Sequence, residues 1–197
     1  MDPGHLWYAL AWASFGLLHS VLAARSVKAR LGSLFGRAYR LAYNGFAVFH
    51  LALVWGLGRL WLDGAPYGLP RAAALLADAA TVAGVVIVLV ALLGYDRRRL
   101  LGLRQLREPD SDEDEPLRID GLHRYVRHPL YSGLFLVLWG NAQSDFGLAT
   151  AAWGSVYLLV GTWFEERRLI DLYGDAYLGY RRSVPAFIPW RGRLTSA

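Results

Sequence analysis

The chain has no cysteine among its 197 residues, which excludes disulfide bonds, thiolate nucleophiles and cysteine-based metal sites. Charged residues are also scarce, at 19% of the chain, whereas a typical soluble domain has about a quarter. Hydrophobic residues make up 55% and aromatic residues 14%. Since Trp and Tyr gather at membrane–water interfaces, this composition favours an integral membrane protein. The start of the chain also lacks the basic segment of a cleavable signal peptide, so we expect its first apolar run to be a retained membrane helix.

Five apolar segments divide the chain. A helix needs about 20 mainly apolar residues to cross a bilayer, and four of the five segments come close to that length. The predicted spans are Leu6–Ala24, Leu41–Leu62, Ala72–Tyr95, Pro129–Ala142 and Gly147–Phe164. The fourth is the shortest, and its tight link to the fifth predicts an antiparallel helical hairpin.

The expected fold is therefore all-α: a polytopic membrane bundle of about five transmembrane helices with a C-terminal cytoplasmic amphipathic helix. We expect a single membrane domain over residues 1–197. Residues 1–95 would supply three spans, 96–128 a cytoplasmic loop, and 129–197 the helical hairpin and tail.

Basic residues orient these spans. Of the 21 Lys and Arg residues, 19 fall in the segments that this arrangement puts on one side, and only Arg59 and Arg71 fall on the other. The positive-inside rule then puts the N-terminus outside and the C-terminus in the cytoplasm, as in a bacterial-type inner membrane. Topology thus explains the net charge of +5, and we expect the lipid bilayer as a partner and no nucleic acid.

The segment Gly121–Gly133, with the sequence GLHRYVRHPLYSG, joins a polar loop to the fourth span. Pro129 suits the first turn of a helix, where its missing N–H is not needed. The N-terminus of that helix and the preceding Arg127 and His128 would form a cationic pocket suited to a carboxylate or phosphate. His128 could instead carry a proton. Gly133 would let a ligand or a helix approach closely.

The segment Phe164–Leu169, with the sequence FEERRL, follows at the cytoplasmic end of the fifth span. A carboxylate at membrane depth is costly unless it binds something. Glu165 and Glu166 point about 100° apart on a helix, so at most one of them faces a given ligand. Because the two spans form a hairpin, both segments reach the same face of the membrane. A third segment, Tyr173–Trp190, is typical of an amphipathic helix followed by a Pro-stiffened tail.

Several of these residues also have simpler interpretations. Arg, His, Glu and Tyr at helix ends are often interfacial anchors, although two such motifs at neighbouring helix ends weaken that interpretation. The acidic run Glu108–Glu115 is typical of a solvated loop, with a lid as the alternative. For His19 and His50 two interpretations are open: a haem- or metal-related role, or simple hydrogen bonding between helices. For Asp78 we expect a packing role.

In this order and spacing, these motifs resemble those of the membrane methyltransferases, over residues 121–190. The resemblance extends to the isoprenylcysteine carboxyl methyltransferases, the bacterial phospholipid N-methyltransferases and the methanethiol S-methyltransferases. Upstream, residues 102–105 resemble the last of these, and residues 15–28 and 39–44 resemble it and the NnrU-like membrane proteins. The chain departs from the usual pattern at Leu122 and His123, where the family commonly has Pro and Tyr.

The resemblance implies methyl transfer from S-adenosylmethionine to a lipophilic or small thiol or carboxylate acceptor at the cytoplasmic membrane face. It implies catalytic roles for Arg127, His128 and Glu165 and no metal. The implied cofactor-binding residues are Tyr125, His128, Leu130, Tyr131, Gly133, Glu165 and Glu166. Two alternatives remain: an NnrU-like accessory protein without enzyme activity, and an NADPH-dependent sterol-type reductase, although no Gly-rich nucleotide motif is present.

Overall fold

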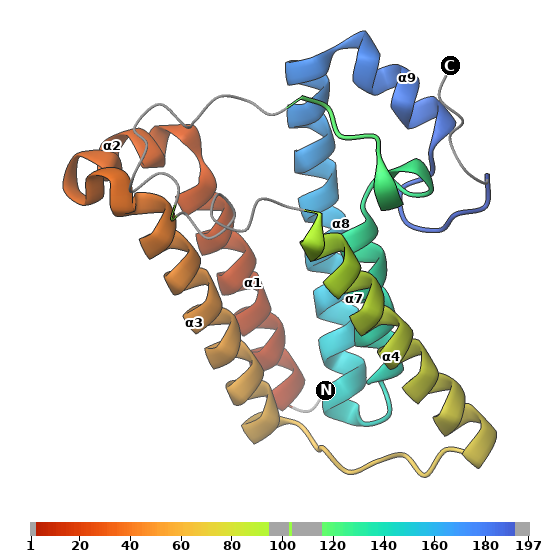
Figure 1. Cartoon of the computed structure of the whole chain (residues 1–197). Helices are drawn as coiled ribbons and strands as arrows, with labels where there is room; N and C mark the ends of the chain where they lie inside the picture. The colour runs from red at the N-terminus through yellow and green to blue at the C-terminus, as the bar shows by residue number, and fades with distance from the viewer. Residues whose placement is uncertain (1–2, 95–102, 104–115, 192–197) are drawn as a thin grey trace. The chain divides into compact units, whose positions relative to one another are not determined.

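The computed structural model describes residues 3–94, 103 and 116–191. Within these ranges the chain is helical and has no strand (Figure 1). One isolated bridge joins Pro66 and Ser144. The described residues divide into two compact units, 3–65 with 103, and 66–94 with 116–191. The all-α class predicted from the sequence is confirmed. Tyr95, residues 102, 104 and 105, and the acidic run Glu108–Glu115 lie outside the described residues.

The first unit is built on two long antiparallel helices, α1 (Pro3–Ala23) and α3 (Tyr39–Trp61). A short helix, α2 (Arg25–Phe35), and one 3-10 turn, η1 (Gly36–Ala38), connect them. Tyr8, Trp12 and Phe15 recur every three or four residues of α1, so they share one face, and all three are buried.

Two histidines in this unit bond across the pair of helices. The Tyr43 hydroxyl lies 2.8 Å from Nε2 of His19. The Ser14 hydroxyl lies 3.2 Å from Nε2 of His50. Both residues therefore have the interhelical hydrogen bonds that the simpler interpretation expected.

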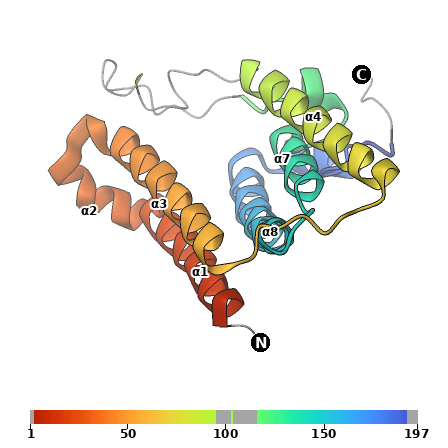
Figure 2. The ribbon, with the colours of Figure 1, turned by 90° about the horizontal axis from the view of Figure 1, so that it is seen from below.

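The second unit contains α4 (Arg71–Leu93), the 3-10 turn η2 (Gly121–Arg124), α7 (Pro129–Gly140), α8 (Asp145–Tyr173) and α9 (Asp175–Ser183). α7 lies between α4 and α8 (Figure 2). α4 and α7 approach so closely that a Cβ added at Gly133 would lie 2.8 Å from the Gly84 oxygen and 2.9 Å from the Val88 nitrogen. Glycine thus permits contact between two helices here, as small residues do in membrane bundles.

A tight turn joins α7 and α8 into the predicted hairpin. Ser144 caps α8, because its hydroxyl accepts a hydrogen bond from the Gly147 N–H at 3.0 Å. The side chain of Gln143 donates to the Asp78 carboxylate at 3.1 Å, which gives this acid of α4 a structural partner. Asn141 donates to Thr81 at 3.2 Å. These bonds tie the turn to α4.

Each predicted span coincides with a helix, but their lengths differ. Within the described part of the chain, three helical segments are long and apolar enough to cross a membrane: Pro3–Ala23, Gly36–Trp61 and Arg71–Leu93. α7 has 12 residues, about 18 Å, which is less than the hydrocarbon core of a bilayer. α8 continues past the expected end at Phe164 to Tyr173, where Gly174 adopts a φ of 55° and ends it. The count of five spans and the single domain stay predictions.

Candidate active site at the mouth of α7

The N-terminal mouth of α7 carries a buried cluster of charges. Nε of Arg127 donates to Oε1 of Glu166 at 2.8 Å, and the Arg127 Nη2 lies 2.6 Å from the same oxygen. Nε2 of His128 lies 3.1 Å from that oxygen. Nε of Arg181 lies 3.3 Å from Oε2 of Glu166. His128 and Glu166 are only 6% and 7% exposed, so two motifs 38 residues apart meet inside the protein.

This environment fixes the ionisation of Glu166. Burial raises the pKa of its carboxyl, but the hydrogen bonds from His128 and Arg127 and their charges outweigh burial and lower the pKa to about 2. Glu166 is therefore an anion at neutral pH. Burial also raises the pKa of the Tyr177 hydroxyl, as does the nearby charge of Glu166. This hydroxyl is buried and has no hydrogen-bond partner among the described residues.

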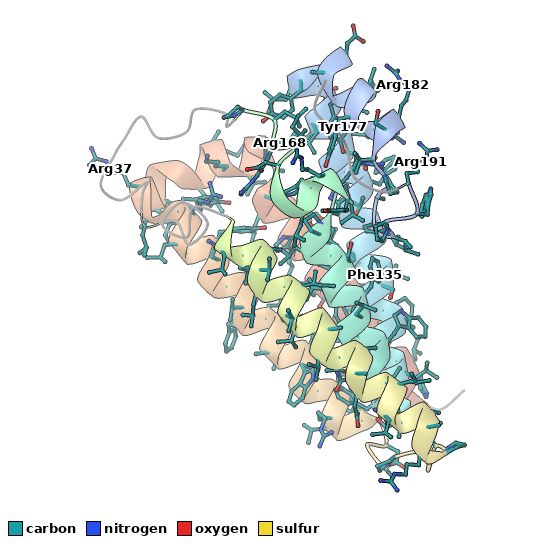
Figure 3. The ribbon with its side chains drawn as sticks, turned by 45° about the vertical axis from the view of Figure 1, so that its right-hand side comes forward. Arg37, Phe135, Arg168, Tyr177, Arg182 and Arg191 are labelled. Atoms are coloured by element: carbon teal, nitrogen blue, oxygen red, sulfur yellow. The ribbon has the colours of Figure 1, made fainter. Side chains whose placement is uncertain are left out.

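The segment Val184–Phe187, which we call the strap, folds back over the helix mouth. The Arg127 N–H donates to the Pro185 oxygen at 2.8 Å, and the His128 N–H donates to the Ala186 oxygen at 3.0 Å. Ser132 Oγ donates to the Phe187 oxygen at 2.8 Å. Tyr177, Tyr180 and Val184 form a small buried core beneath α9, whereas Arg182 points to the outside (Figure 3).

The loop before α7 is tied to the same region. The Tyr180 hydroxyl donates to the His123 oxygen at 2.7 Å. Burial lowers the pKa of His123, so its ring is neutral, and its Nδ1 lies 3.1 Å from the Arg127 oxygen. His123, where the sequence departs from the pattern it resembles, thus has a structural role at the loop edge.

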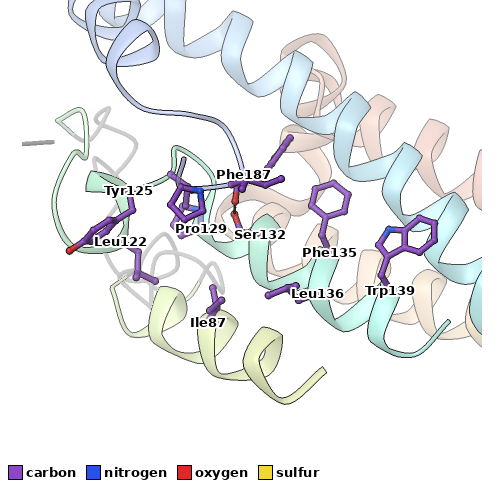
Figure 4. A pocket seen from close by; sticks show the side chains of 12 residues that line it. Ile87, Leu122, Tyr125, Pro129, Ser132, Phe135, Leu136, Trp139 and Phe187 are labelled. Atoms are coloured by element: carbon purple, nitrogen blue, oxygen red, sulfur yellow. Dashed lines mark hydrogen bonds between the residues drawn. The ribbon is translucent and has the colours of Figure 1, made fainter. Parts of the chain in front are cut away.

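An apolar cavity of about 700 Å³ lies between α4, α7 and residues 187–189. Figure 4 shows the side chains that line it. α4 contributes Ile87, and α7 contributes a row of side chains that includes Phe135 and Trp139. Phe187 of the strap closes one side, and its ring lies 5.8 Å from the His128 ring and 5.1 Å from the Phe135 ring. The cavity and the charged cluster therefore share a wall.

The predicted site residues have different positions in this arrangement. Arg127, His128 and Glu166 are brought together, and Tyr125 lines the cavity while remaining 39% exposed. The Tyr131 ring stacks on His128 with centroids 5.6 Å apart. Leu130 lies in the first turn of α7, outside the cavity lining.

Two predicted residues lie elsewhere. Gly133 faces α4 and does not line the cavity, because its missing side chain makes room for the backbone of that helix. Glu165 is outside the Arg127–Glu166 bond: its side chain is 45% exposed, and its Oε2 lies 3.7 Å from Nδ1 of His128. The buried carboxylate is Glu166, because the rotation of α8 turns that residue inward. The ligand-binding roles expected of Leu130, Gly133 and Glu165 stay predictions.

Sequence reasoning missed three parts of the site. Arg181 was indistinguishable from Arg182, since two adjacent arginines carry the same signal. The sequence predicts a Pro-stiffened tail where the strap lies, and the return of this segment to residues 127–132 has no local signature. Phe135 and Trp139 belong to an apolar run, and the sequence pattern does not distinguish side chains that line a cavity from side chains that face lipid. Among the described residues, no three His, Asp or Glu side chains lie close enough together to hold a metal ion.

Fold and site together define a helical protein suited to a membrane, with an ionic cluster and an apolar cavity at one helix mouth. The chain is 39% identical over 114 residues to methanethiol S-methyltransferase of Crocosphaera subtropica. This match covers 56% of the chain and 45% of the relative. It is 37% identical over 113 residues to methanethiol S-methyltransferase 1 of Bradyrhizobium diazoefficiens, covering 55% of the chain and 40% of the relative.

A second group of relatives carries a different name. The chain is 36% identical over 84 residues to protein-S-isoprenylcysteine O-methyltransferase of Schizosaccharomyces pombe, covering 40% of the chain and 35% of the relative. No family model matches the chain, and no solved structure matches it. The chain spans less than half the length of these curated relatives. These similarities support its relation to the membrane methyltransferases that resemble isoprenylcysteine carboxyl methyltransferase.

Proposed function

We propose that the protein is a membrane-bound methyltransferase that uses S-adenosylmethionine at the cytoplasmic membrane face. The observation that carries the proposal is the meeting of Arg127, His128 and Glu166 at the mouth of α7, beside an apolar cavity. The names of the relatives support the reaction class. The inner-membrane location, with the N-terminus outside, belongs to the same proposal and draws on the distribution of basic residues.

The side chains present at this mouth fit the chemistry of the cofactor. A sulfonium cation is stabilised by aromatic faces and carboxylates, and the cavity wall is rich in aromatic rings. Glu165 is the carboxylate of its pair that is exposed and has no arginine partner among the described residues. Glu165 and Tyr125 would hold the cofactor at the helix mouth, and the apolar part of the cavity would be left to the acceptor. When bound, it would supply an electrophilic methyl group whose leaving group is a neutral thioether.

The protein's own contribution would be alignment and exclusion of water. The cavity walls from α4, α7 and Phe187 would hold the acceptor in line with the methyl group, and proximity of this kind accounts for much of an enzyme's acceleration. A thiol acceptor must also lose its proton. In this proposal Oε2 of Glu165, which lies 3.7 Å from Nδ1 of His128 and has no arginine partner among the described residues, would receive it, whereas Glu166 is already paired with arginine.

The size of the cavity favours a lipophilic acceptor. About 700 Å³ lies within the range of roughly 300–1,000 Å³ that pockets for drug-sized molecules occupy. A one-carbon thiol would leave most of this apolar space unfilled. An acceptor with a long apolar chain, entering from the lipid side, would fill it and bury its own hydrophobic surface.

Calorimetry on the detergent-purified protein tests the proposal. We expect saturable binding of S-adenosylhomocysteine, weakened in Glu165→Gln, and no binding of NADPH. Binding of NADPH alone would support the reductase, and binding of neither would support a non-enzymatic accessory protein. Both results would overturn the methyltransferase.

A radiolabelled-methyl assay tests the acceptor. A long-chain thiol should be methylated faster than methanethiol, and Phe135→Trp, which fills part of the cavity, should slow the long-chain reaction more than it weakens S-adenosylhomocysteine binding. Preference for methanethiol in the unmodified protein would refute the lipophilic acceptor.

A further inference from the structure

Glu166 and Glu165 are neighbours in sequence but have different surroundings. Oε1 of Glu166 accepts from Arg127 and His128, and Oε2 faces Arg181. The Glu166 side chain is 9% exposed. A carboxylate that already accepts from Arg127 and His128 and pairs with Arg181 has little capacity left for a ligand. The ion-pair contact of Glu165 among the described residues is with His128 at 3.7 Å, and its side chain is 45% exposed.

The donors that hold Glu166 also hold the strap. Nη1 of Arg127 donates to the Val184 oxygen at 2.6 Å and to the Arg181 oxygen at 3.3 Å. Arg181 lies in α9, three residues before the strap begins. Glu166 therefore connects α8 to the C-terminal turn of α9 and to the first residue of the strap. The buried Val184, which is 1% exposed, depends on this closed arrangement.

The same carboxylate also orients His128. An ionised carboxylate can only accept hydrogen bonds, so the 3.1 Å contact assigns the hydrogen to Nε2 of His128. Nδ1 then faces the exposed Glu165. A residue that fixes the tautomer of a neighbouring imidazole acts through it without touching the reacting atoms.

We propose that Glu166 is a positioning residue: through Arg127 and Arg181 it clamps the strap onto the mouth of α7 and holds His128 in its Nε2–H tautomer. Glu165 is then the carboxylate of the pair that faces a ligand. The ligand-facing role of Glu165 rests on the proposed function. The clamp formed by Glu166 can be tested without an activity assay.

The absence of cysteine makes the strap easy to probe. In a Val184→Cys protein, the thiol is buried when the strap is closed, and a maleimide reagent labels it only when the strap lifts. Adding Glu166→Gln should accelerate labelling roughly tenfold, and adding Arg181→Gln roughly threefold, because each weakens the closed state. Arg182→Gln and Glu165→Gln are the matched controls and should leave the labelling rate unchanged.

Arg181→Gln keeps the test valid if Glu166→Gln does not fold, since the Arg181 side chain is 48% exposed. Equal labelling rates in the Arg181→Gln and Arg182→Gln proteins would overturn the clamp. Labelling accelerated by Glu165→Gln as strongly as by Glu166→Gln would overturn the division of roles.

The tautomer gives a second readout, which a purely structural role would not move. In the NMR spectrum of protein with ¹⁵N-labelled histidine, the His128 signal is the one that disappears in His128→Asn. This signal should show a single Nε2–H tautomer in the parent chain and a mixture of tautomers in Glu166→Gln. An Nδ1–H tautomer in the parent chain would refute the proposed orientation. If S-adenosylhomocysteine does not bind at all, the proposed function fails, while the labelling and tautomer results still decide the clamp.

Discussion

Replacement of Glu166 by Gln removes one buried negative charge and keeps the volume of the side chain. Arg127, whose side chain is 10% exposed, then loses its carboxylate partner. The pKa of Glu166 is about 2 in the folded protein, against an ordinary value of 4.5, and this difference corresponds to about 3 kcal/mol of stability at neutral pH. Breaking a buried ion pair by removing one partner costs a similar amount, about 3–5 kcal/mol.

The dependence on pH identifies the source of this stability. Because the folded-state pKa lies below the unfolded-state value, the contribution is complete above about pH 5 and is lost as the pH falls from 4.5 towards 2. The difference in unfolding free energy between the parent chain and Glu166→Gln should therefore be constant from pH 8 to about 5.5. It should be roughly halved near pH 3.

Denaturant unfolding in detergent micelles, followed by the fluorescence of the eight Trp residues, measures this difference. Glu165→Gln is the matched control. Its side chain is 45% exposed, so we expect a change within about 0.5 kcal/mol. Equal stability losses in the two variants, or a Glu166→Gln difference that stays constant down to pH 3, would refute the reasoning.

Three further substitutions test the packing of the second unit, each by the same unfolding assay. Gly133→Ala should lower the free energy of unfolding by about 1–3 kcal/mol, because the added methyl group meets the backbone of α4. Gly161→Ala is the control: a Cβ there has nothing within 4 Å, so this change should be neutral or stabilising. Equal effects of the two changes would contradict the close helix contact. Ser144→Ala should cost about 1 kcal/mol through loss of the α8 cap, and no loss would mean that this hydrogen bond is dispensable. Tyr180→Phe should cost about 1 kcal/mol, since it removes the bond to the His123 oxygen, and an unchanged stability would show that water replaces it.

The helices were predictable because their signals are local. Apolar length located α1, α3 and α4 to within three residues of their ends. Pro129 marked the start of α7, because a proline suits the first turn of a helix. The end of α8 was missed, since polar residues that continue a helix beyond an apolar run look the same as a loop in a hydropathy pattern.

The sequence by itself also determined which motifs could carry chemistry and that the hairpin would bring Arg127 and His128 close to the Glu pair. Only the tertiary structure decided that Glu166 turns inward, that Arg181 joins it and Arg182 does not, and that Gly133 serves a helix contact. Each of these choices depends on how far a helix is rotated about its axis. These choices also depend on long-range pairings, such as the hydrogen bond from Arg127 to Val184, which lies 57 residues later in the chain. A local sequence pattern encodes neither the rotation of a helix nor such a pairing.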